Sequence, residues 1–351
     1  MEEQNPNKGY PKYKELEKII VDPVSGSSIQ AKISDPRVQL KMESIEVLIR
    51  QLLQISEDFH ILVLEHSRLE NANIFSLLNF SRDIKGGFLD TGSRSTGTIN
   101  EARKIFDVEV IGSSRESAYT YIPQCDWIPH NISFLHITST NELQGNRISN
   151  FPKISLPIIC DRSADLFSDQ ISFHGLDLIY AHGDDEIVPA NYSIILIRDS
   201  LLKTISSSIF ATRMLIQNIY DYNRIKFNDL FLLHHSLKTL HQNGGVAQKV
   251  SRISRLSLAL YREIERNTKF RPIVNVKDRS LQAIRFFVAM AADEFRFALL
   301  LDNNDLNIIE KSPHADFLIL LKKCKENEIS KLIGIMQEFE VKPEIQIYEG
   351  L

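Results

Sequence analysis

Cysteine is scarce in this chain of 351 residues, with three widely spaced examples at Cys125, Cys160 and Cys324. Their number and spacing fit neither a disulfide framework nor a zinc site, so we expect reduced thiols, a cytoplasmic protein and no bound metal. No apolar run reaches the roughly 20 residues that span a bilayer, and the polar N-terminus lacks the apolar core of a signal peptide. The formal net charge of −4 offers no basic excess for nucleic acid or a membrane surface. We therefore expect neither nucleic-acid nor membrane binding.

Short apolar runs alternate with polar or helical segments in the first two thirds of the chain. Apolar positions spaced three and four apart predict a helix over 38–54, and a shorter helix is expected over 98–106. Six apolar runs are expected to be buried strands, at 60–65, 107–112, 133–138, 156–161, 176–181 and 192–198. Strands that alternate with helices predict an α/β fold with a mainly parallel sheet.

The pattern becomes helical from about residue 228. Helices are expected over 228–242, which ends at an Asn-Gly-Gly stop, and over 246–267, which is long and amphipathic. Two further apolar runs, 285–292 and 295–301, are expected to be strands of a smaller lobe, which a helix over 330–340 closes.

These elements predict two domains. Residues 38–243 are expected to form a large α/β domain, and residues 244–351 a long linking helix with a small α+β domain; residues 1–37 lie outside both. The active sites of such proteins lie at the carboxyl ends of the parallel strands, near the junction of the lobes.

An ordered series of short motifs runs along residues 38–340. The motifs are Asp90-Thr91-Gly92-Ser93-Arg94-Ser95, Tyr121-Ile122-Pro123 with Trp127, 138–145 (TSTNELQG), Asp161-Arg162-Ser163-Ala164 and 175–181 (GLDLIYA). In this order they resemble the phosphoserine aminotransferases, class V aminotransferases of the fold-type I pyridoxal-phosphate (PLP) superfamily. The resemblance implies the aspartate-aminotransferase-like PLP-transferase fold, PLP chemistry of serine biosynthesis, and homodimers whose sites lie at the subunit interface.

The resemblance also implies a lysine that holds PLP as an imine, within the stretch that here spans residues 181–191. The lysine position is Asp185, and no lysine lies between Lys153 and Lys203. A carboxylate cannot form an imine. The three acids at 184–186 also oppose an anionic cofactor. We therefore expect no catalytic residue here and no bound cofactor.

Other family positions form a remnant pocket by resemblance. Asp161 corresponds to the acid that pairs with the pyridinium nitrogen, and Ser163 follows it. Arg94 replaces the stacking tryptophan, and Arg68 lies in an altered phosphate cradle. Asn223 corresponds to an asparagine that reaches the phosphate from the partner subunit.

Further departures affect the surroundings of the cofactor and the substrate clamp. Glu142 stands where the family has a threonine near the cofactor. Lys311 and Phe317 stand where it has two arginines that grip the substrate. The joint pattern predicts a pseudoenzyme, a phosphoserine-aminotransferase-like scaffold for binding or assembly, as a homodimer or as a heterodimer with a paralogue.

Alternatives remain open. A divergent enzyme would use PLP or pyridoxamine phosphate (PMP) without a Schiff-base lysine, with His182 as the local candidate base. The acids at 184–186, with Asp161, suggest a metal site or an acidic surface loop. A sensor of an anion or small ligand would use Arg68, Arg94 and Arg162 in the former cleft.

Overall fold

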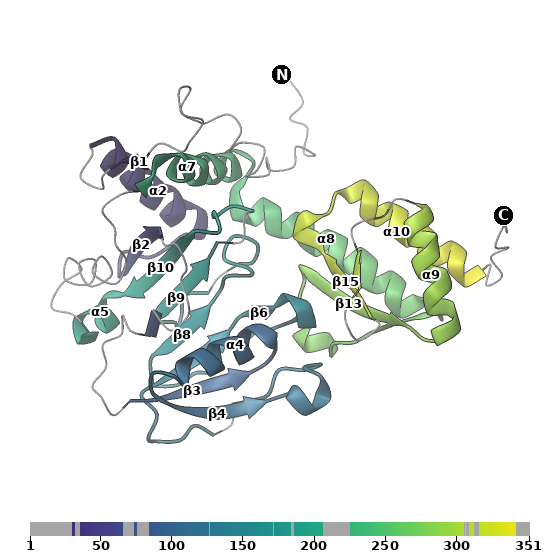
Figure 1. Cartoon of the computed structure of the whole chain (residues 1–351), viewed down its shortest axis with the longest axis horizontal. Helices are drawn as coiled ribbons and strands as arrows, with labels where there is room; N and C mark the ends of the chain where they lie inside the picture. The colour runs from purple at the N-terminus through teal and green to yellow at the C-terminus, as the bar shows by residue number, and fades with distance from the viewer. Residues whose placement is uncertain are drawn as a thin grey trace.

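The structure is a computed structural model, and it shows two lobes joined by one long helix (Figure 1). It describes residues 30–31, 36–65, 74–75, 84–125, 127–170, 172–183, 186–205, 225–304, 306, 309–311 and 316–341.

A seven-stranded sheet forms the centre of the larger lobe. Its order is β2 (Phe59–Glu65), β10 (Tyr192–Arg198), β9 (Leu178–His182), β8 (Ile158–Asp161), β5 (Phe134–Thr138), β3 (Lys85–Asp90) and β4 (Asp107–Ser113). Neighbouring strands pair in parallel except at β10, which runs antiparallel to β9 and β2. The predicted α/β fold with a mainly parallel sheet is confirmed.

Helices cover both faces of this sheet. On one face, α2 (Pro36–Leu53) and α7 (Phe227–Gln242) pack against each other and share a core with alternate strand residues. On the other face, α4 (Ser93–Ala102) and α5 (Asp199–Ile205) bury the residues in between. Because both faces are covered, the strands are apolar throughout rather than alternating.

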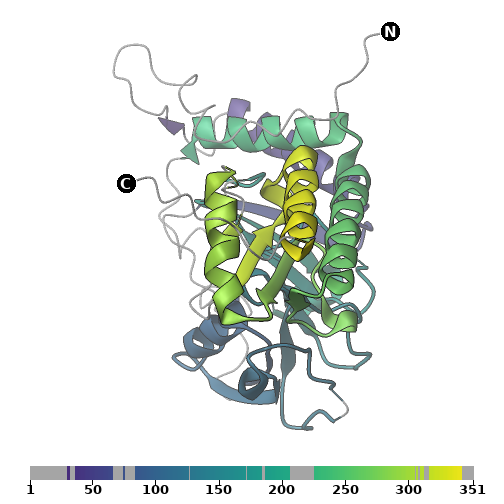
Figure 2. The same ribbon diagram turned by 90° about the vertical axis from the view of Figure 1, so that its right-hand side faces the viewer.

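The smaller lobe is an antiparallel sheet with helices on one face (Figure 2). Its strand order is β12 (Phe270–Pro272), β13 (Ala283–Val288), β15 (Phe317–Leu320) and β14 (Ile309–Lys311). Three helices enclose its core, namely α8 (Gly245–Arg266), α9 (Ala291–Asn303) and α10 (Glu326–Val341). Helix α8 spans both lobes, since Val246 packs into the large core and Ile253 into the small one.

Shorter elements lie at the edges and at the junction. Strand β1 (Gln30–Ala31) pairs with β11 (Ile225–Lys226), and β6 (Thr140–Asn141) with β7 (Asn146–Arg147). The 3-10 turns are η1 (Arg115–Ser117), η2 (Glu142–Gln144), η3 (Val276–Asp278) and η4 (Leu321–Lys323).

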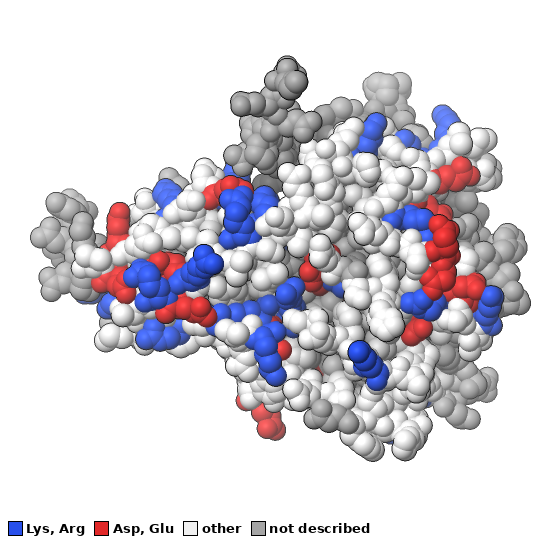
Figure 3. Space-filling model, turned by 180° about the vertical axis from the view of Figure 1, so that it is seen from behind, with Lys and Arg blue, Asp and Glu red and all other residues white. Residues whose placement is uncertain are grey.

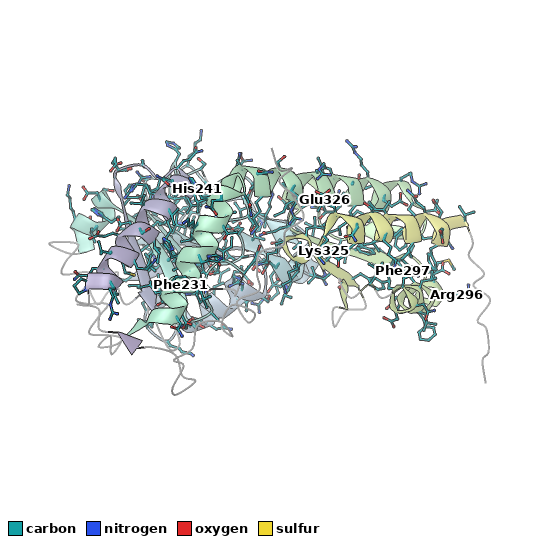
Figure 4. All side chains as sticks on the ribbon, turned by 90° about the horizontal axis from the view of Figure 1, so that it is seen from above. Phe231, His241, Arg296, Phe297, Lys325 and Glu326 are labelled. Atoms are coloured by element: carbon teal, nitrogen blue, oxygen red, sulfur yellow. The ribbon has the colours of Figure 1, made fainter. Side chains whose placement is uncertain are left out.

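One expected strand is wrong. The run 295–301 lies within α9, and the strand expected over 285–292 ends at Val288. Phe297 is fully buried in the small core, whereas Phe295 is 66% exposed and Arg296 lies on the outer side (Figure 4). Burial in this segment thus follows the helical period. The sequence does not reveal this period because the apolar run is nearly continuous. The helix expected over 98–106 also begins earlier, at Ser93.

Candidate functional site

The carboxyl ends of the parallel strands meet at one edge of the large sheet, next to the smaller lobe. Strand β8 ends at Asp161 and strand β9 ends at His182. Asp161 pairs in register with Tyr180, so its carboxylate and the His182 ring belong to neighbouring strand ends. Parallel sheets of this kind bind their ligands at this edge.

Asp161 is a buried carboxylate with one oxygen engaged. Its Oδ1 accepts hydrogen bonds from the backbone N–H of Ser163 at 2.8 Å and from the Ser163 hydroxyl at 2.5 Å. The side chain is 1% exposed, and Oδ2 has no hydrogen-bond partner among the described residues. A buried acceptor without a donor is destabilising, so the hydrogen-bonding capacity of this oxygen is unsatisfied.

His182 is held at the end of β9 by two serines. Its backbone N–H donates to the Ser163 hydroxyl at 3.0 Å, and its Nδ1 lies 2.8 Å from the Ser193 hydroxyl. Burial lowers the pKa of the imidazole; nearby Arg94 lowers it further, while Asp161 opposes the shift. The ring is therefore neutral at pH 7, which would let it accept a proton.

Helix α4 brings Arg94 to the same edge. Its N-cap residue, Gly92, packs so closely that a Cβ there would lie 2.4 Å from Asn141 Cγ. The Ser95 hydroxyl accepts hydrogen bonds from the N–H groups of Thr91 and Gly92, which fixes the start of the helix. The first turn of α4 therefore lies against the loop that follows β5.

Arg94 and Glu142, two of the departures from the family pattern, contact each other. The Arg94 guanidinium lies 4.0 Å from a Glu142 carboxylate oxygen. Burial disfavours the Arg94 cation, but the carboxylates of Asp161 and Glu142 outweigh this effect and raise its pKa. Glu142 is also 2.9 Å from the ammonium of Lys322, a side chain that is only 4% exposed. Lys322 belongs to η4 of the smaller lobe, so this ion pair crosses the junction.

A neutral polar layer lies beneath the strand ends. His136 Nε2 lies 2.9 Å from the Tyr180 hydroxyl. Burial lowers the pKa of His136 to about 4 and raises that of Tyr180 well above its usual value. Both groups are therefore uncharged over the physiological range and serve the packing of the sheet.

Arg162, expected as an anion ligand, is engaged within the protein. It is 2% exposed, and its Nε donates to Asp165 at 3.0 Å while its NH2 lies 3.5 Å from Asp169. Phe317, at a former arginine position, is buried in the small core. The structure thus brings together Asp161, Ser163, His182 and Arg94, and it gives Arg162 and Phe317 other partners.

Several expected positions cannot be placed. Asp184, Asp185, Arg68 and Asn223 lie outside the described residues, as does the side chain of Lys311. Within the described ranges, no group of three or more His, Cys, Asp or Glu side chains is arranged to hold a metal ion. In the same part of the chain, no helix combines the length and apolar character that a membrane crossing requires.

Sequence reasoning missed the charged residues that surround the edge. Lys322 joins Glu142, and Lys249 of α8, which is 2% exposed, lies 2.5 Å from Glu186 in the loop after β9. Partners 63 and 180 residues away leave no local signal by which these pairs could have been found.

The residues at this edge supply only part of what is required to hold PLP, the cofactor that the resemblance implies. The free Oδ2 of Asp161 suits a ring N–H donor. An imine needs a lysine amine, yet the sequence has none between Lys153 and Lys203. Lys249 and Lys322, buried near this edge, are both held in ion pairs. The residues present therefore do not fit a covalently held PLP.

Comparison with known proteins finds relatives named phosphoserine aminotransferase. No family model matches the chain. The chain is 32% identical over 212 residues to a phosphoserine aminotransferase of Flavobacterium johnsoniae, and this stretch covers 58% of each protein. It is 28% identical over 311 residues to the phosphoserine aminotransferase of Azobacteroides pseudotrichonymphae, covering 86% of each.

Solved structures give the same result for the fold. The phosphoserine aminotransferase of Bacillus circulans subsp. alkalophilus superposes with a TM-score of 0.77 at 19% identity, over 94% of this chain and 95% of that one. The PLP-bound enzyme of Trichomonas vaginalis gives a TM-score of 0.76 at 19% identity, over 95% and 98%. The fold is thus that of the PLP-dependent aminotransferases, and the relatives that the sequence matches are named phosphoserine aminotransferase.

Proposed function

We propose that this chain is a phosphoserine-aminotransferase-like protein that does not catalyse transamination and that acts through binding or assembly. The observation that carries this proposal is the missing amine. Strand β9 ends at His182 beside Asp161, and the stretch that follows, like everything from 154 to 202, contains no lysine. Without that amine, the imine and the proton shuttle of a transaminase have no residue to perform them.

Lysines from elsewhere are poor substitutes. Lys322 and Lys249 are the buried lysines described near this edge, and each ammonium is within 2.9 Å of a carboxylate oxygen. Each amine is occupied by its carboxylate partner, so it is not free to attack a carbonyl group. Moving either group to the cofactor would also break an ion pair with a partly buried glutamate.

An exposed apolar surface supports a role in assembly. Leu40 and Val47 lie seven residues apart on α2 and are 66% and 53% exposed. Phe231 on α7 is 38% exposed, and the ammonium of Lys41 lies 5.4 Å from its ring centroid, so the two helices present these side chains side by side. Apolar side chains grouped on paired helices are typical of protein interfaces. On the face seen in Figure 3, by contrast, basic and acidic side chains are interspersed. We propose a homodimer, or a heterodimer with a paralogue, through the α2–α7 surface.

The proposal is tested by assaying amino transfer between phosphoserine and 2-oxoglutarate with added PLP, with an active phosphoserine aminotransferase as the positive control. We expect no turnover. We also expect none from Asp185→Lys, because Arg94 and Glu142 still occupy the surroundings of Asp161. Light scattering after size-exclusion chromatography gives the assembly state, which we expect Leu40→Asp to reduce. Turnover by the unaltered protein would refute the proposal.

A second candidate is a divergent enzyme, and two observations favour it. His182 has a lowered pKa at the strand end, and Asp161 keeps an unsatisfied oxygen that suits a ring N–H. Tight non-covalent binding of PMP that Asp161→Asn abolishes, together with turnover that His182→Ala abolishes, would establish this candidate.

A further inference from the structure

Helices α2 and α7 lie side by side and run in the same direction. The Ser44 hydroxyl of α2 lies 2.9 Å from His234 Nε2 of α7, and the ammonium of Lys41 lies 5.4 Å from the ring centroid of Phe231. Both contacts join residues that are 190 positions apart in the sequence. A residue of α2 is therefore level with the residue of α7 whose number is higher by 190. Because each residue advances a helix by about 1.5 Å, this offset gives the relative heights of the side chains on the pair.

The two helices contribute different side chains to the outer face of the pair. On each helix these side chains are exposed or half-buried and are spaced three and four residues apart, so they form one stripe. The stripes consist of Leu40, Glu43 and Val47 on α2, and of Phe231, His235 and Lys238 on α7. The rings of Phe231 and His235 are stacked, with centroids 6.4 Å apart. Figure 4 looks onto this end of the larger lobe and labels Phe231 near the start of α7. The α2 stripe is thus apolar and acidic, and the α7 stripe is aromatic and basic.

The two stripes complement each other under a two-fold rotation. A rotation about an axis that runs along the helices and between them lays α2 of a second copy over α7 of the first, and α7 over α2. Heights along the axis are preserved, so each α2 side chain of the stripe faces an α7 side chain of the other copy within two residues, or about 3 Å, of its own height. The facing pairs are Leu40 with Phe231, Glu43 with His235, and Val47 with Lys238. An apolar group thus meets an aromatic ring, a carboxylate meets an imidazole, and a valine meets the aliphatic stem of a lysine.

We propose that the partner at the α2–α7 surface is a second copy of this chain, related by a two-fold axis between the helices, so that α2 of each copy packs on α7 of the other. The inference rests on the proposed function, whose assembly it specifies. An interface between identical copies must be self-complementary, and this one chain supplies the groups for both sides. An axis across the helices would instead lay α7 on α7, where the lysines would repel each other.

Disulfide cross-linking of the full chain tests this arrangement. Cys125→Ser provides the background, since the other two native thiols are buried. Leu40→Cys and Phe231→Cys are prepared as separate variants, mixed, oxidised mildly and examined by non-reducing electrophoresis and peptide mass spectrometry. We expect a linked dimer in the mixture and none in either variant alone, because the disulfide requires α2 of one copy to face α7 of the other. Packed helices lie about 8–10 Å apart, so the two copies of α2 are too distant to be linked to each other.

A second pair of variants keeps the apolar contact intact. Glu43→Cys mixed with His235→Cys should link in the same way, and Arg103→Cys, exposed on α4, is the control that should not link to any of the four variants. A linked dimer in Leu40→Cys alone would place α2 on α2 and overturn the inference, as would a dimer that neither mixture links. A protein that light scattering shows to be monomeric would overturn the inference together with the proposed assembly. Failure of the proposed inactivity would show differently, as turnover by the unaltered protein.

Discussion

Breaking the ion pair between Glu142 and Lys322 is expected to be strongly destabilising. The pair joins η2 of the larger lobe to η4 of the smaller lobe at 2.9 Å, and the side chains are 17% and 4% exposed. Glu142→Gln keeps the shape of the side chain and leaves the buried ammonium of Lys322 without its carboxylate. Removing one partner of a buried ion pair lowers the free energy of unfolding by about 3–5 kcal/mol. Because Glu142 is partly exposed, we expect a loss of about 3 kcal/mol here.

The reverse change should be milder. Lys322→Met removes the ammonium and leaves Glu142 beside Arg94 at 4.0 Å, so the carboxylate retains a cation. We expect Lys322→Met to lower the free energy of unfolding by about 1 kcal/mol. The double variant should lose roughly 2 kcal/mol less than the sum of the two single losses. Urea unfolding followed by far-UV circular dichroism measures all four proteins.

A matched pair within one sheet provides the control. Lys85 and Glu109 lie 2.5 Å apart on β3 and β4, but their side chains are 32% and 29% exposed. The same substitutions there should change the free energy of unfolding by less than about 1 kcal/mol. If the Glu142 and Lys322 substitutions behave like this control, or if their effects are additive, the reasoning about the junction is refuted.

Three further outcomes are expected. Gly183→Ala should cost about 1–3 kcal/mol or prevent folding, because a Cβ there would lie 1.8 Å from the carbonyl oxygen of Pro189, whereas Gly97→Ala in α4 meets nothing within 4 Å and should gain about 0.5–1 kcal/mol; thermal unfolding compares the two. The pKa of His136 is about 4 in the folded protein against 6.5 unfolded, so the unfolded chain binds the proton first. The contribution of neutral His136 to the free energy of unfolding should thus be fully present above about pH 6.5 and be lost, by roughly 3 kcal/mol, as the pH falls toward 4. Denaturation at several pH values measures this slope, which His136→Gln should reduce. Of the three thiols, Cys125 alone is not buried, so a thiol reagent should titrate one group in the native protein and three after unfolding; three fast groups in the native state would contradict the packing.

Much of the larger lobe follows from the sequence because its sheet is covered on both faces. The runs at 60–65 and 192–198 are apolar almost throughout, as strands buried on two sides must be, and both are strands in the structure. The long helix over 246–267 is equally predictable from the sequence, because one of its faces is apolar and the other is charged. The strand expected over 295–301 is wrong because apolar residues also stand outside the core, at exposed Phe295 and half-buried Leu299, and they conceal the helical period.

The site is only partly predictable, and distance along the chain explains the difference. Asp161 could be expected at the edge because it ends an apolar strand, and it does lie there. The contact between Arg94 and Glu142 joins segments 48 residues apart, and that between Glu142 and Lys322 joins segments 180 residues apart. Such pairings depend on how α4 and the smaller lobe are docked, and local sequence patterns do not encode docking. The role of Asp185 stays a prediction from the resemblance.

The central claim, that this chain forms no imine with PLP, is tested most directly by an absorbance titration of the purified protein with PLP, followed by borohydride reduction and peptide mass spectrometry. The account predicts no aldimine absorption band and no lysine modified in proportion to the protein. A stoichiometric adduct on a single lysine, with Lys322 and Lys249 the first to inspect, would contradict it.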